Sequence, residues 1–79
     1  MILIITEQTD VPTLKESQAY VGGYVETLCI PGRGILLFNE DGKAKNLAEN
    51  PTASHLAGVP IVGKVIWLAS PLHLNWGCE

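Results

Sequence analysis

The side chains that could catalyse a reaction are few in this sequence, and they do not fall at catalytic spacings. His55 and His73 are the two imidazoles, and Ser54 and Ser70 lie beside apolar residues without the nucleophile-elbow pattern. Glu26 is the one carboxylate in the middle of a predicted strand, so weak hydrolysis through Glu26 or His55 is one hypothesis. A strand glutamate usually faces solvent, however. We therefore predict a protein that is not an enzyme and that needs no cofactor.

Metal binding is not expected either. Cys29 and Cys78 form neither a CxxC pair nor a Cys/His cluster with zinc spacing. Cys29 lies in an apolar run and is expected to be buried, whereas Cys78 is expected to be exposed near the C-terminus. The first residues lack the basic region and cleavage site of a signal peptide. No apolar stretch approaches the roughly 20 residues of a membrane span. We expect a cytoplasmic protein with no membrane partner.

Two segments could instead bind a ligand through the main chain. The paired glycines Gly22 and Gly23 could let backbone amides approach an anion or a planar ligand, with Tyr20 and Tyr24 near enough to stack on it. The alternative is a helix end that leads into a strand, with both tyrosines packed against the sheet and the helix.

The second segment is the start of a predicted helix at Asn50. Free amides and the positive end of the helix dipole suit a phosphate or carboxylate. Thr52 and Ser54 would add hydroxyl groups there, and His55 would add a charged donor. The alternative is an ordinary capped helix with a solvent-facing histidine.

The charge balance bears on partners. Five basic and eight acidic residues leave a net charge of −3, and the basic residues form no run. Nucleic-acid binding requires a clustered positive surface, so that hypothesis predicts that Arg33, Lys43 and Lys45 converge on one face. The acidic balance favours a protein partner over an anionic ligand, and nucleic acid is not the expected partner.

Self-association is also expected. Seventy-nine residues lie near the lower limit for a stable hydrophobic core. Exposed tryptophans are enriched at interfaces, so Trp76 in the polar tail could join a second copy, as could an open sheet edge. The alternative is that Trp76 folds back onto its own domain.

The elements that must position these groups follow from periodicity and from end signals. A threonine at 13 and a glutamate at 16 form a capping box for a helix over Leu14–Val21, and a second, shorter helix runs from Pro51 to Gly58. Strands are predicted over Met1–Thr6, Tyr24–Ile30, Ile35–Phe38, Lys43–Asn46 and Val59–Ala69. The predicted fold is α+β, with element order β-α-β-β-β-α-β: a mostly antiparallel sheet of four to five strands with two short helices on one face. Residues 1–70 form one domain, and residues 71–79 form a C-terminal tail.

Four short patterns in the chain belong together. They are Gln18-x-x-Val21-Gly22-Gly23-Tyr24-Val25-Glu26, Asn39-Glu40-Asp41-Gly42-Lys43, Asn50-x-x-Ala53-x-x-Leu56 and Ile61-Val62-Gly63-Lys64-Val65. Over about Leu14 to Leu68 the chain resembles a family of short phage- and plasmid-associated domains of unknown function. It departs from that pattern at Leu47–Asn50, where the usual proline is missing.

The resemblance implies a mobile-element setting, in which small proteins often act by stoichiometric binding. It suggests antagonism of a host defence system, either by blocking a host effector protein or by sequestering a nucleotide second messenger. The alternative is a nucleic-acid-binding or regulatory accessory protein.

Overall fold

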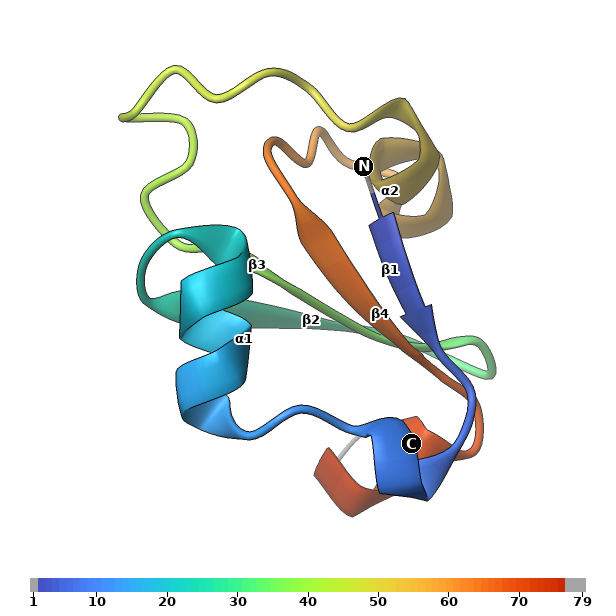
Figure 1. Ribbon diagram of the computed structural model, residues 1–79. Coiled ribbons are helices and arrows are strands. Elements are labelled where there is room, and N and C mark those ends of the chain that lie inside the picture. The colour runs from blue at the N-terminus through green and yellow to red at the C-terminus, as the bar shows by residue number, and fades with distance from the viewer. Residues whose placement is uncertain (1, 77–79) are drawn as a thin grey trace.

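Four strands form one mixed sheet in the computed structural model, which describes residues 2–76 apart from the side chains of residues 73 and 75. The strands are β1 (Ile2–Ile5), β2 (Val25–Ile30), β3 (Gly34–Asn39) and β4 (Val65–Ala69). Their spatial order is β1-β4-β3-β2 (Figure 1). β1 runs parallel to β4, and the other two pairs are antiparallel. The predicted α+β class with a mostly antiparallel sheet is confirmed.

The two helices have the predicted end signals. α1 (Leu14–Val21) begins at a capping box, in which the Glu16 amide donates to the Thr13 hydroxyl at 3.1 Å and the Thr13 amide donates to the Glu16 carboxylate at 2.8 Å. α2 (Pro51–Ala57) begins after Asn50, and both helices end at a glycine in the left-handed conformation. Short 3-10 turns, η1 (Gln8–Asp10) and η2 (Leu72–Trp76), complete the described chain.

The helices cover opposite faces of the sheet, and the expectation of both helices on one face is wrong. On one face, Ile35 and Leu37 of β3 belong to a cluster against which Tyr20 of α1 packs. On the other face, Leu36 of β3 clusters with Ala53 of α2. Successive strand side chains point to opposite faces, and Ile35, Leu36 and Leu37 are all at most 1% exposed. A central strand with an uninterrupted apolar run needs cover on both faces.

Two predicted strands also need correction. Residues 41–46 form successive turns instead of a short edge strand, because the Lys45 and Leu47 amides donate back to Asp41 and Gly42. The predicted strand Val59–Ala69 begins only at Val65. Before that point, Pro60 has no amide hydrogen to donate, and Gly63 adopts a positive φ of 82°.

Residues 71–79 are predicted to form a tail beyond the domain of residues 1–70, yet a residue after β4 contributes to the core. Leu72 is only 7% exposed and belongs to the α1-side cluster. Cys29 was expected to be buried, yet it is exposed on β2, and its sulfur is disulfide-bonded. Cys29 pairs with Ile35 and shares its face of the sheet, but it lies on the edge strand β2, where its side chain stays open to solvent. The expectation for Cys78 lies outside the described residues. Among the described residues, no helix is both long and apolar enough to cross a membrane.

Candidate functional site

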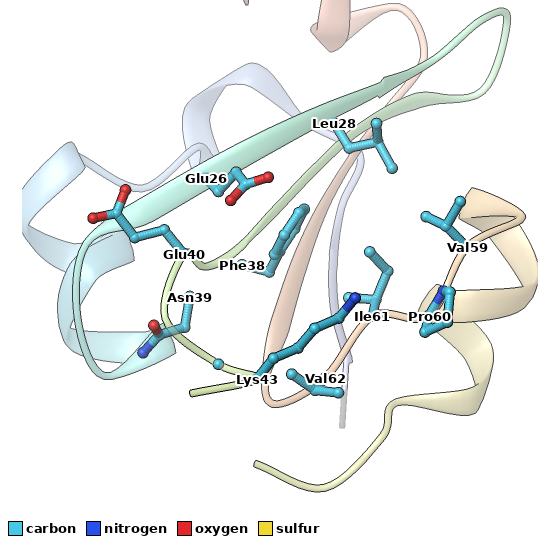
Figure 2. A pocket seen from close by; sticks show the side chains of 11 residues that line it. Glu26, Leu28, Phe38, Asn39, Glu40, Lys43, Val59, Pro60, Ile61 and Val62 are labelled. Atoms are coloured by element: carbon cyan, nitrogen blue, oxygen red, sulfur yellow. The ribbon is translucent and has the colours of Figure 1, made fainter. Parts of the chain in front are cut away.

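A hollow of about 270 Å³ lies where the end of the β2–β3 hairpin meets the loop before β4. We call it the charged groove. Its eleven lining residues are Glu26, Leu28, Phe38, Asn39, Glu40, Gly42, Lys43, Val59, Pro60, Ile61 and Val62. Figure 2 shows Glu26 and Glu40 at one end, Leu28 and Val59 at the other, and the Lys43 side chain stretched between the sheet and the loop.

One wall of the charged groove is the hairpin itself. The register pairs Glu26 with Phe38 and Leu28 with Leu36, so Glu26, Leu28 and Phe38 face the α2 side together. Asn39 then ends β3 and is only 4% exposed. Its side-chain amide donates to the Val21 carbonyl at 3.1 Å, and its carbonyl oxygen accepts from the Asp41 amide at 2.8 Å. These two hydrogen bonds of Asn39 orient the turn that leads to Lys43.

The opposite wall is the loop Val59–Gly63. An isolated antiparallel bridge joins Glu49 to Val62, and the Gly63 amide donates to the Ala48 carbonyl at 2.7 Å. The turn and the loop approach closely, because a Cβ atom at Gly42 would lie 2.7 Å from a methyl carbon of Val62. Main-chain bonds therefore hold the loop to residues 48 and 49, and the close approach of Gly42 to Val62 brings the two walls together.

The rim of the charged groove carries two acidic side chains and one basic side chain. Glu26, Glu40 and Lys43 are all exposed. Within residues 2–76, no hydrogen bond or ion pair was found for these three side chains. Two carboxylates, one ammonium group and an apolar floor suit a chain segment with both apolar and basic side chains better than they suit an anion. No group of three or more potential metal ligands occurs within the described residues.

The residues predicted around the end of α1 are near each other, but their main-chain donors are engaged. The amides of Gly22 and Gly23 both donate to the Gln18 carbonyl, at 2.9 and 3.1 Å. A Cβ at Gly23 would lie 2.9 Å from the side-chain amide of Asn39, so this glycine makes room for the turn. Tyr20 is half-buried with the Lys64 ammonium 5.4 Å from its ring centroid, and Tyr24 is 69% exposed.

The residues predicted at the start of α2 divide into two groups. Asn50 is 2% exposed and caps the helix by accepting from the Ala53 amide. The Ser54 hydroxyl exchanges hydrogen bonds with the main chain of Ile61, at 2.8 and 3.1 Å. Thr52 and His55 are exposed and line a separate apolar hollow beside Trp67. The Asn50 side-chain amide also donates to the Gly63 carbonyl at 3.0 Å, so Asn50 and Ser54 hold the loop of the charged groove against α2.

The remaining predicted residues lie apart. Arg33 precedes β3, whereas Lys43 and Lys45 follow it, and a six-residue strand separates them by about 20 Å. The three cations therefore do not converge. Trp76 lies in η2 and is 39% exposed.

Of the residues that line the charged groove, only Lys43 is among the binding residues predicted from the sequence, and the apolar wall is not among them. Val59, Pro60 and Ile61 were assigned to a strand because of their apolar character. Pro60 and Gly63 were the sequence signals that could have indicated a loop here, since proline and glycine both interrupt strand pairing.

The chain matches the domain of unknown function DUF3846 over residues 2–73. That match covers most of the chain, and the protein belongs to this family, as the resemblance to a domain of unknown function predicted. Neither a curated protein nor a solved structure matches the chain significantly.

Proposed function

We propose that this protein is a small non-enzymatic binding protein of phage or mobile-element origin that antagonises a host defence system by attaching to a host effector protein. The charged groove is the proposed attachment site. The single observation that supports it best is the combination of an apolar floor with two carboxylates that lack partners within the described residues.

A protein partner fits the charged groove better than a nucleotide second messenger does. A nucleotide carries phosphate groups, and Glu26 and Glu40 would repel them at the groove rim. The alternative ligand sites have little to offer, since the amides of Gly22 and Gly23 are already bonded within the chain. A basic and apolar segment of a protein would meet both the carboxylates and the floor favourably.

The nucleic-acid alternative is supported less well. It required Arg33, Lys43 and Lys45 on one face, and β3 separates Arg33 from the two lysines. A duplex backbone needs several cations arranged along one surface, and the net charge of −3 works against such binding.

The experiment compares groove variants with a matched surface variant. The tagged chain is used to isolate a partner from bacterial cells that carry defence systems, and the purified partner is then titrated calorimetrically. Val59 is 49% exposed on the groove wall, so Val59→Asp should fold and should weaken binding about tenfold or more, equivalent to about 1.4 kcal/mol. Glu26→Lys should weaken it as well, since it reverses one of the rim charges.

Leu14→Asp is the control, because Leu14 is 62% exposed on α1 and away from the charged groove. It should bind as the unmodified chain does. Equal affinity of all three variants would show that the partner binds elsewhere. Saturable binding of a nucleotide panel, without any protein partner, would replace protein attachment with ligand sequestration.

A further inference from the structure

β1 is the outermost strand on its side of the sheet. It pairs with β4 on one side only, in the register Ile2 with Val65 through Ile5 with Leu68 (Figure 1). An edge strand presents a row of main-chain donors and acceptors along its open side, and these can pair with another extended chain.

The open edge of β1 has none of the side chains that usually block such pairing. Its sequence is Ile-Leu-Ile-Ile, without charge, proline or glycine. Leu3 is 39% exposed and Ile4 is 50% exposed, on opposite faces of the sheet. The other edge strand, β2, differs because it carries the charged Glu26 and the polar Thr27 in exposed positions. Natural proteins protect sheet edges with charged residues or proline. The edge of β1 has neither, so it favours pairing with another strand.

A second apolar surface continues from this edge across the α2 face. Ile4 pairs with Trp67, and paired side chains on neighbouring strands point to the same face. Trp67 also lines an apolar hollow of about 400 Å³ together with Pro51, His55 and Leu56. The exposed side chain of Ile4 therefore lies beside this hollow, and a strand added at β1 would bring its own side chains to the same place.

We infer that β1 pairs with β1 of a second copy of this chain, antiparallel about a twofold axis at Ile4. In that register Leu3 lies opposite Ile5 of the second copy. The two Ile4 side chains lie opposite each other, beside the apolar hollow that Trp67 lines in each copy. The pairing joins two four-stranded sheets into one continuous sheet. A second copy fits because the pairing is self-complementary: the pairs within β1, Leu3 with Ile5 and Ile4 with Ile4, each join two apolar residues, and Ile2 lies opposite Thr6 just beyond the strand.

The charges that flank β1 also favour a second copy in this orientation. Lys64 immediately precedes Val65, the partner of Ile2, whereas Glu7 lies two residues beyond Ile5 at the other end of the strand. Antiparallel pairing brings the Lys64 end of each copy to the Glu7 end of the other, with one β1 strand between the two side chains, so opposite charges lie at the same end of the joined sheet. Parallel pairing would bring like charges together, which is unfavourable.

Analytical ultracentrifugation of the full chain over a range of concentrations tests the inference. The mass should rise from 8.5 kDa toward twice that value as concentration increases. Ile4→Lys places a charge at the twofold axis and should raise the dimer dissociation constant by about tenfold or more. Leu14→Lys is the matched control, because Leu14 is exposed on α1 away from β1, and it should dimerise normally. A chain that stays at 8.5 kDa at all concentrations would overturn the inference.

Further variants test the register and do not depend on the folding of Ile4→Lys. Glu7→Lys and Lys64→Glu should each weaken the dimer, and the double exchange should restore it. Under mild oxidation, Ile4→Cys should form a disulfide dimer faster than Leu14→Cys, because a residue at a twofold axis lies next to its own copy. Equal crosslinking rates, or a double exchange no better than the single changes, would rule out this interface.

Discussion

The charged groove and the open edge of β1 are built in different ways. The groove draws eleven residues from the hairpin, the turn after β3 and the loop before β4, and three of them are charged. The β1 edge consists of four consecutive residues without a charge. A surface assembled from loops can place charges where a particular partner needs them, whereas a bare strand edge offers main-chain groups that match any uncharged strand. This contrast underlies our two proposals, a foreign partner at the groove and a second copy of the chain at the edge.

The largest expected effect is a loss of stability and of partner binding when the side chain that positions the groove turn is removed. Asn39→Ala removes two hydrogen bonds and leaves the Val21 carbonyl without its side-chain donor. Urea unfolding should show a loss of about 2–3 kcal/mol of stability. Partner binding should fall further than β1 pairing does, since Asn39 is at the end of β3 that adjoins the groove.

Asn46→Gly is the control for Asn39→Ala. Asn46 is exposed with a φ of 55°, a conformation that glycine adopts without strain. The free energy of unfolding of the Asn46→Gly variant should be unchanged or slightly increased. A loss for Asn46→Gly as large as that for Asn39→Ala would show that the turn as a whole, not the Asn39 side chain, sets the frame.

A smaller effect should come from closing the space between the two groove walls. The added methyl group of Gly42→Ala would lie 2.7 Å from a Val62 methyl carbon, so the walls must separate. We expect a destabilisation of about 1–2 kcal/mol, with changes in NMR chemical shifts around Val62 and none in β1.

Gly32→Ala provides the comparison for Gly42→Ala. It meets no atom within 4 Å but sits at a φ of 75°, so it should cost about 1–2 kcal/mol through backbone strain alone. Only the Gly42 variant should weaken partner binding. If both variants weaken it equally, the groove responds to general stability and not to its own width.

The smallest effect concerns α1, whose capping box lies outside both surfaces. Hydrogen bonding from the Thr13 amide, and secondarily from its hydroxyl, holds the pKa of Glu16 below its ordinary value. A carboxyl group with a lowered folded-state pKa contributes stability above its unfolded pKa, and that contribution is lost as pH falls through the folded pKa. NMR titration should show that Thr13→Ala raises the pKa of Glu16. Glu16→Gln should remove this contribution to the free energy of unfolding. If the free energy of unfolding of Glu16→Gln fell with decreasing pH as steeply as that of the unmodified chain, this account would be contradicted.

Local signals in the sequence predicted the helices well. The capping box at Thr13 and Glu16, the Asn50 cap and the two terminal glycines each act within a few residues, so their effect does not depend on the rest of the fold. The strands were predicted less accurately where apolar composition outweighed Pro60 and Gly63. The position of Lys43 in a turn beside a groove could not be predicted, because it depends on a hydrogen bond between Asn39 and Val21, eighteen residues away.

The amino-acid sequence by itself determined the fold class, the helix boundaries and the family membership, because capping, periodicity and motif spacing are local properties of the chain. Only the tertiary structure decided that the helices lie on opposite faces, that Arg33 and Lys43 are at opposite ends of β3, and that β1 is an edge. These features depend on the order of strands in the sheet, which is set by contacts between residues far apart in the sequence. A strand with the same residues would be buried in the centre of one sheet and open to a second copy at the edge of another.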